Sequence, residues 1–327
     1  MRAWQVHELG DPGDVLTLDE IPVPEPGPTQ VVVRVRAVAA NFPDSLLCQG
    51  RYQVRPELPF TPGLEVCGEV TAVGSQVSGW ALGDRVIGTP TFPHAGYADY
   101  AVLESAATFA APSVLDDAEA SALLIGYQTG WFALARRAAL QPGETLLVHA
   151  AAGGVGSAAV QLGKAMGARV IGVAGGAEKA DYVRRLGADV VIDRRTEDFV
   201  AVVNEVTGGA GADVIYDPVG GDTYDRSTKC IAFEGRILVI GFAGGRIQAP
   251  ALNHALIKNY SIVGLHWGLY ATKNPAMVTR CHEELVRMAA DGLIRPFISE
   301  RLPLEAVREG VQRLANGETV GRLVFLP

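Results

Sequence analysis

The chain has 327 residues, of which 48% are hydrophobic and 20% are charged, and it contains 38 glycines and 19 prolines. This length exceeds what a single hydrophobic core usually serves, so we expect two domains, and the composition excludes a disordered or fibrous protein. The formal net charge of −8 opposes binding to nucleic acid and to anionic membranes, which leaves small molecules as the expected partners.

The sequence contains no membrane-spanning pattern. No apolar stretch reaches the roughly 20 residues that a membrane span needs, and the N-terminus has no apolar signal core. We therefore expect a cytoplasmic protein without a membrane partner. The four cysteines stand too far apart for a Cys-x-x-Cys pair, so neither a structural zinc site nor a disulfide framework is indicated.

Short strands separated by Gly and Pro are predicted from the start of the chain to residue 123. We expect strands at 31–39, 66–73, 85–88 and 97–102. This texture is typical of a compact all-β domain. From about residue 118 onward the pattern changes to helix.

Strands and helices then alternate up to residue 265. The predicted elements are strands at 145–149, 169–174, 190–192, 212–216, 235–240 and 260–264, with helices at 154–166 and 177–186. Such alternation favours right-handed βαβ units and a parallel sheet covered on both faces. Helices are predicted again at 277–291 and 304–316, before a last strand at 321–326. We assign this tail to the first domain, which then comprises residues 1–123 and 266–327 around a second domain at 124–265.

The most specific motif is the segment Ala151-Ala152-Gly153-Gly154-Val155-Gly156, which lies between a predicted strand and a predicted helix. This is the context that a dinucleotide-binding fingerprint requires. Gly153 would let the backbone approach the pyrophosphate, and Gly156 would let helix and strand pack closely. Residues 152–156 are therefore candidate cofactor ligands, with amides at the helix start facing the phosphates. A glycine-rich turn without a ligand is the alternative.

The next strand ends in Ala174-Gly175-Gly176, where an NAD site would place an acidic residue for the ribose hydroxyls. Because no carboxylate stands there, NADPH is favoured over NADH. Lys179 and Arg194 are candidate donors to the 2′-phosphate. Two alternatives stay open: Lys179 belongs to a solvated helix face, or Arg195 rather than Arg194 binds the 2′-phosphate.

These features combine with Asn41-Phe42-Pro43-Asp44, Gly63-Leu64-Glu65 and Gly83-Asp84-Arg85-Val86. Together they make the chain resemble the medium-chain dehydrogenase/reductase superfamily, and within it the zinc-free NADPH:quinone oxidoreductases, the zeta-crystallin-like branch. The resemblance extends to the ending Val320-Gly321-Arg322-Leu323. It implies an α/β protein with a Rossmann doubly wound parallel sheet, a GroES-like β-rich catalytic domain, and an active site in the cleft between them.

The resemblance also implies that no metal is bound. Zinc-dependent members of the superfamily carry a Cys where this chain has Asn41, and a His where it has Leu64. An amide and a leucine cannot supply two of the three ligands that a catalytic zinc needs. We expect Glu65 to make a structural polar contact.

The site residues implied by the resemblance come from both domains. Asn41, Asp44 and Tyr52 are the catalytic candidates, with Asn41 and Asp44 orienting cofactor and substrate. Tyr52 is either an aromatic wall or a proton donor, since a phenol with a pKa near 10 donates slowly unless perturbed. Thr129 would lie near the nicotinamide ribose or phosphate, or else it is an ordinary helix residue bonded to its own backbone.

The remaining cofactor candidates are Gly241 and Phe242, which follow the predicted strand 235–240. Without a metal, direct hydride addition to an activated acceptor remains feasible. The expected activity is hydride transfer from NADPH to a quinone. Reduction of an enone or enoyl double bond is the alternative, and a non-catalytic NADPH-binding protein is a third possibility.

The strand predicted at 260–264 is expected at the edge of its sheet. Relatives pair such edges across a two-fold axis, so the resemblance implies a homodimer, and pairing would cover an exposed apolar edge. The alternative is that the segment 266–268 caps this edge within one subunit.

Overall fold

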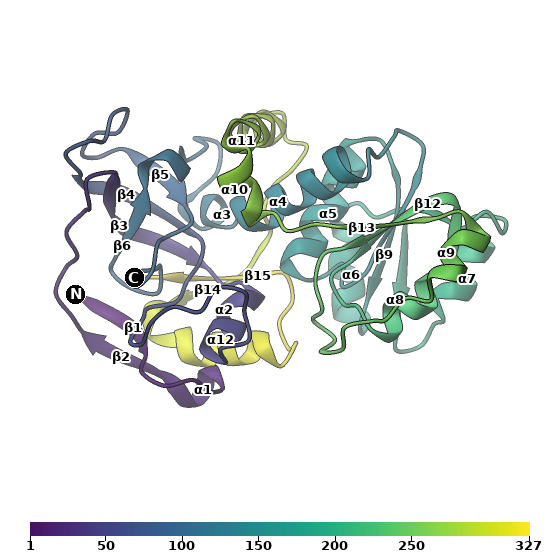
Figure 1. The fold of residues 1–327 in the computed structure, drawn as a ribbon, viewed down its shortest axis with the longest axis horizontal. Coiled ribbons are helices and arrows are strands. Elements are labelled where there is room, and N and C mark those ends of the chain that lie inside the picture. The colour runs from purple at the N-terminus through teal and green to yellow at the C-terminus, as the bar shows by residue number, and fades with distance from the viewer. The chain divides into compact units, whose positions relative to one another are not determined.

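The computed structural model describes all 327 residues and divides into two compact units (Figure 1). The first unit comprises Met1–Leu124 and Arg295–Pro327, and the second comprises Ile125–Ile294. The chain passes from the first unit to the second next to the boundary expected from the sequence. It returns to the first unit later than expected, because residues 266–294 belong to the second unit rather than to the first.

Aromatic contacts explain where residues 266–294 belong. Helices α10 (Gly268–Lys273) and α11 (Pro275–Ala290) follow the last strand of the second unit. The ring of Tyr270 stacks on Phe132 at 4.2 Å between centroids, and the Trp131 indole donates a hydrogen bond of 2.8 Å to Glu284. These partners come from α4 (Leu124–Trp131) and the π-helical turn Phe132–Arg137 that continues it. A helix pattern alone does not reveal such partners.

The second unit contains a six-stranded parallel sheet with the order β10-β9-β8-β11-β12-β13. Counted along the chain, this is the 3-2-1-4-5-6 order of a Rossmann fold, so the predicted doubly wound sheet is confirmed. The strands are β8 (Thr145–Val148), β9 (Arg169–Ala174), β10 (Val190–Asp193), β11 (Ala212–Asp217), β12 (Ile231–Val239) and β13 (Ser261–Gly264).

Helices connect these strands, as right-handed crossovers require. They are α5 (Gly154–Ala165), α6 (Ala177–Arg185), α7 (Phe199–Val206), α8 (Asp222–Ser227) and α9 (Leu252–Lys258). Leu147, Ile171, Ile215 and Ile237 are fully buried in the core between sheet and helices. No helix of either unit is both long and apolar enough to cross a bilayer.

The first unit is built on a seven-stranded sheet with the order β14-β15-β3-β4-β5-β7, in which β6 also pairs with β3, and on a separate pair of strands, β1 and β2. Strand β15 pairs with β14 in parallel and with β3 in antiparallel orientation, so the end of the chain joins the N-terminal sheet. The strands are β1 (Arg2–Val6), β2 (Leu16–Glu20), β3 (Gln30–Ala39), β4 (Val66–Val73), β5 (Arg85–Gly88), β6 (Tyr100–Glu104), β7 (Thr108–Ala110), β14 (Ile298–Pro303) and β15 (Arg322–Leu326).

The N-terminal part of this unit is not all-β, which corrects the prediction. It also contains α1 (Pro12–Val15), α2 (Phe42–Cys48) and α3 (Asp117–Ser121), and α12 (Val307–Ala315) comes from the tail. Helix α2 begins after Asn41, with Pro43 in its first turn. The Asp44 carboxylate accepts a hydrogen bond of 2.8 Å from the backbone N–H of Asn41. This cap starts a helix that is too short to show an apolar period.

Candidate active site

The dinucleotide turn connects β8 to α5 in the second unit. Gly153 is the N-cap of α5, with φ −86° and ψ 173°, and the first amides of a helix have no partner within it. A Cβ at Gly156 would lie 2.2 Å from the Ala150 carbonyl oxygen, so only glycine allows helix and turn to approach this closely. A Cβ at Gly153 would meet only that same oxygen, at 3.3 Å. Gly156 therefore packs the turn, and space beside Gly153 is open to a ligand.

His149, in this turn, is hydrogen-bonded to helix α8. Its Nε2 lies 2.8 Å from the Ser227 hydroxyl, which donates its own hydrogen to the Thr223 carbonyl at 2.7 Å. The imidazole must therefore donate through Nε2. Burial lowers the pKa of His149 to about 3, so the ring is neutral and its part is structural.

Two arginines lie against the turn that follows β9. A Cβ at Gly175 would be 3.1 Å from the Nε of Arg194, and a Cβ at Gly176 would be 2.9 Å from the Nη1 of Arg195. The pKa of Lys179 is lowered by burial and by the positive charges of Arg195 and Arg194. The turn is therefore surrounded by three cationic side chains, and neither arginine is in an ion pair.

Two of the other cofactor candidates lie at a neighbouring strand end, and the third lies on a helix. Ile240 is joined through its amide to the carbonyl of Asp217 at 3.0 Å, so the segment with Gly241 and Phe242 lies beside the end of β11. Phe242 is 40% exposed. Thr129 is buried on α4, and this helix approaches the start of α5 so closely that a Cβ at Gly126 would be 3.2 Å from the Gly154 carbonyl oxygen. The carboxyl ends of parallel strands are where such folds bind ligands.

Asn41, in the first unit, has a fixed amide orientation. Its Nδ2 donates to the Ala39 carbonyl at 3.1 Å and to the Glu65 carboxylate at 3.0 Å, and its Oδ1 accepts from Arg322 at 2.9 Å. A carbonyl and a carboxylate only accept, and a guanidinium only donates, so the amide cannot be flipped. Both N–H groups are used. Toward a ligand, Asn41 can act only as an acceptor.

Glu65 and Arg322 form the buried ion pair behind Asn41. The Nη2 of Arg322 donates to the Glu65 Oε2 at 2.5 Å, and the two side chains are 6% and 0% exposed. The Nε of Arg322 is buried without a partner. Nothing in the sequence indicates this pairing, because Arg322 lies 257 residues from Glu65.

Asp44 is fully buried and accepts four hydrogen bonds. The donors are the backbone N–H of Asn41 at 2.8 Å, the Tyr97 hydroxyl at 2.9 Å, and the backbone N–H groups of Gly63 at 3.1 Å and Leu64 at 3.2 Å. Burial raises the pKa of Asp44 to about 6, against the opposing effect of these bonds. The carboxylate is therefore ionised above about pH 6, and it holds the strand–helix junction that carries Asn41.

Tyr52 follows α2 in a loop and is half-buried. Its pKa is raised by burial and by the charge of Asp44. The phenol is therefore fully protonated at neutral pH. Of the three predicted catalytic residues, Tyr52 alone carries a titratable proton at neutral pH, and burial makes this phenol a weaker acid than a free one.

A Rossmann sheet with this turn, together with a β-rich unit carrying a polar buried cluster, defines an NAD(P)-dependent dehydrogenase/reductase. The chain matches the alcohol dehydrogenase GroES-like domain family over residues 27–133 and the zinc-binding dehydrogenase family over residues 154–283.

Individual relatives narrow this class. The chain is 40% identical over 326 residues to the quinone oxidoreductase-like protein 2 homolog of Nematostella vectensis, covering 99% of this chain and 88% of that protein. Escherichia coli quinone oxidoreductase complexed with NADPH is similar with a TM-score of 0.91 and 31% identity, covering 100% of both chains. CurK enoyl reductase has a TM-score of 0.88 and 26% identity, covering 99% and 98%. The chain belongs to the medium-chain dehydrogenase/reductase superfamily, in its quinone oxidoreductase branch.

Proposed function

We propose that this protein is a zinc-independent oxidoreductase that transfers a hydride from NADPH to a quinone. When bound, NADPH supplies the hydride from its nicotinamide ring. The residues of the chain bind and orient the coenzyme. Asn41 accepts a hydrogen bond, and Tyr52 holds a proton.

The chemistry of positions 41, 64 and 65 carries this proposal. A catalytic zinc takes three protein ligands from His, Cys and carboxylate. Asn41 is an amide whose N–H groups are both used, Leu64 offers no ligand atom, and Glu65 is already neutralised by Arg322. Without a Lewis acid, alcohol oxidation is disfavoured, whereas an electron-poor quinone accepts hydride directly once it is oriented.

The choice of NADPH is supported by charge around the turn after β9. Arg194 and Arg195 lie against Gly175 and Gly176, and Lys179 is close enough to both arginines for their charges to lower its pKa. Three cationic side chains gathered at one turn favour a polyanionic ligand group. A 2′-phosphate meets that requirement, and a ribose hydroxyl does not.

Among the predicted catalytic residues, Tyr52 is the proton donor that we propose, and another hydroxyl or solvent is the alternative source of the proton. Asn41 has no free N–H, and Asp44 is ionised at neutral pH with four donors around it. Tyr52 is protonated at neutral pH, and its raised pKa makes it a weaker acid than a free phenol. In this proposal Asn41 orients the ligand, Asp44 holds the junction that carries Asn41, and the Tyr52 hydroxyl protonates the reduced acceptor.

NADPH oxidation by the purified protein tests the proposal, with 9,10-phenanthrenequinone, 1,4-benzoquinone, an enone and an enoyl thioester as acceptors. We expect turnover with the quinones, unchanged by chelators, and no stoichiometric zinc by metal analysis. Stoichiometric zinc together with loss of activity on chelation would overturn the zinc-free assignment. Tight NADPH binding without oxidation by any acceptor would favour a non-catalytic protein.

Reduction of an enone or enoyl double bond is the second candidate. The similarity to CurK enoyl reductase over almost the whole chain favours it. This reaction also needs no metal, and it uses the same coenzyme and the same proton donor. Faster turnover with the enoyl thioester than with either quinone would transfer the assignment to this activity.

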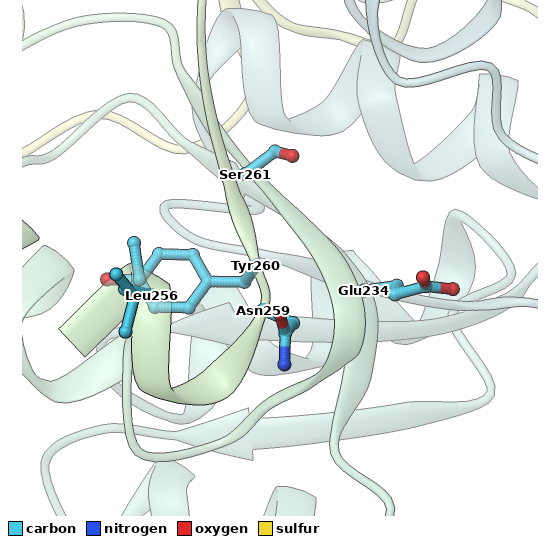
Figure 2. A pocket seen from close by; sticks show the side chains of 6 residues that line it. Glu234, Leu256, Asn259, Tyr260 and Ser261 are labelled. Atoms are coloured by element: carbon cyan, nitrogen blue, oxygen red, sulfur yellow. The ribbon is translucent and has the colours of Figure 1, made fainter. Parts of the chain in front are cut away.

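We further propose a homodimer formed through the edge of the Rossmann sheet. Strand β13 pairs only with β12, so its outer edge is open. Beside it, α9 exposes Leu252 at 70%, Leu256 at 76% and Ile257 at 68%. Figure 2 shows the hollow between this helix and the sheet, lined by Glu234, Ala255, Leu256, Asn259, Tyr260 and Ser261. A second copy would cover both the apolar side chains and the unpaired edge.

The contacts of the segment 266–268 do not support the alternative that this segment caps the edge of β13 within one subunit. The Trp267 indole donates a hydrogen bond of 2.9 Å to the buried Gln128 of α4. Trp267 is therefore engaged with a helix rather than with the outer edge of β13. The cytoplasmic location expected from the sequence stays a prediction.

A further inference from the structure

A carboxylate stands among the cations at the turn after β9. Asp193 is the last residue of β10 and pairs in register with Ala174, the last residue of β9. It is followed directly by Arg194 and Arg195. A carboxylate in this place would ordinarily repel a 2′-phosphate, so its presence in an NADPH site calls for a physical reason.

The hydrogen bonds of Asp193 supply that reason. Its Oδ1 accepts from the Gly176 amide at 2.8 Å and from the Arg195 amide at 3.0 Å. One oxygen thus ties the turn after β9 to the turn after β10. Gly176 has a φ of +98°, a conformation that side-chain-bearing residues rarely adopt, and this bond holds it there.

The same oxygen sets the path of the two arginines. With the Arg195 amide anchored, its guanidinium lies against Gly176, where a Cβ would be 2.9 Å from Nη1. The Arg194 amide is bound to the Ala174 carbonyl at 2.9 Å, and its Nε would be 3.1 Å from a Cβ on Gly175. Both guanidinium groups are thereby directed to one turn from adjacent residues of the chain.

We propose that Asp193 is a positioning residue for recognition of the 2′-phosphate, and that Arg195 joins Lys179 and Arg194 in binding it. The inference rests on the proposed function, which assigns this turn to the 2′-phosphate of NADPH. It gives Asp193 two opposing effects. Its oxygen builds the phosphate site, while its negative charge weakens the attraction of that site for the phosphate.

Two substitutions separate these effects. Asp193→Ala removes the oxygen and the charge together, so we expect the Kd for NADPH to rise about tenfold or more, because two charge-assisted hydrogen bonds are lost. Asp193→Asn keeps an acceptor oxygen at the same reach and removes the charge, so the Kd for NADPH should stay the same or fall. The Kd for NADH should change less than about twofold in both variants, because NADH has no 2′-phosphate.

The measurement is a fluorescence titration of the full-length variants with NADPH and with NADH. Competition by 2′,5′-ADP and by 5′-AMP isolates the contribution of the phosphate. Asp189→Asn is the matched control, because it removes the same charge from the residue before β10, where Asp189 binds Lys164 and the Val170 amide at the other end of the strand. Arg195→Gln should weaken NADPH and 2′,5′-ADP but leave NADH and 5′-AMP unchanged.

Two results would overturn the inference. In one, Asp193→Asn weakens NADPH as much as Asp193→Ala, which would mean that the oxygen does not position the site. In the other, Asp193→Ala weakens NADH by the same factor, which would mean that Asp193 supports the turn without regard to the phosphate. Failure of the underlying assignment shows differently: a Lys179→Ala/Arg194→Ala protein that keeps its preference for NADPH would place the phosphate elsewhere.

Discussion

Alanine substitutions at Gly156 and Gly153 should have opposite effects on stability and on coenzyme binding. A Cβ at Gly156 would lie 2.2 Å from the oxygen and 2.8 Å from the carbon of the Ala150 carbonyl, and 2.9 Å from the Cα of Ala151. All three atoms are backbone, so helix α5 must retreat from the turn by more than about 1 Å to reach ordinary contact. Overpacking of this kind costs about 1–3 kcal/mol, which at roughly 2–4 °C per kcal/mol lowers the Tm of the apo protein by several degrees.

Gly153→Ala is the matched control. Its Cβ would meet only the Ala150 oxygen, at 3.3 Å, and its φ of −86° and ψ of 173° suit alanine. We expect stability within about 0.5 kcal/mol of the unmodified protein. The added methyl group would occupy the side of the turn that the pyrophosphate approaches, so the affinity for NADPH should fall about tenfold or more, equivalent to about 1.4 kcal/mol.

Thermal denaturation of both apo variants and fluorescence titration with NADPH provide the test. A Gly156→Ala protein as stable as the unmodified chain would contradict the packing argument. A Gly153→Ala protein that loses stability but binds NADPH normally would show that the turn does not carry the coenzyme.

Four further predictions concern the first unit and the subunit contact. Tyr52→Phe should lower quinone turnover at least about tenfold with an unchanged Kd for NADPH; unchanged turnover would leave the ring only a wall of the site. Arg322→Met should lower the free energy of unfolding by about 3–5 kcal/mol, because the buried Glu65 charge loses its partner. The double variant with Glu65→Met should recover much of this loss in chemical denaturation, and equal losses in the single and double variants would refute the pairing. Because the pKa of Asp44 is raised, the pH-dependent part of its contribution to stability is fully present below its unfolded pKa of about 3.9 and is lost as the pH rises through about 6. The stability difference between the unmodified protein and Asp44→Asn should therefore shrink over that interval, and a constant difference would contradict this. Leu256→Glu should convert the dimer to a monomer in light scattering, and a monomeric unmodified protein would remove the proposed interface.

The second unit was largely predictable from the sequence because its signals are local. The apolar runs of β8 and β9 are separated by a glycine-rich turn and a helix of ordinary length, and each of these can be read within a short window. The Gly156 contact shows why the motif works, since the third glycine meets a backbone oxygen only six residues away. The missing acid after β9 was visible for the same reason.

The first unit was harder to predict because its cluster is assembled from distant segments. Asn41 and Asp44 were expected as site residues, but nothing near them in the sequence indicates that Arg322 and Glu65 fix the Asn41 amide. Helix α2 was missed because a seven-residue helix shows no clear period. The sequence does not show where the chain returns to the first unit, because α10 is held to the second unit by an aromatic contact and α11 by a polar one.

The ion pair between Glu65 and Arg322 also constrains how the protein is made. During synthesis Glu65 leaves the ribosome long before Arg322, which follows 257 residues later, and the whole Rossmann unit emerges in between. Until then β3 lacks its partner β15, and the carboxylate has no cation with which to be buried. The N-terminal unit therefore completes its fold last, and a chain truncated before β15 should keep a folded nucleotide-binding unit beside an unfinished partner.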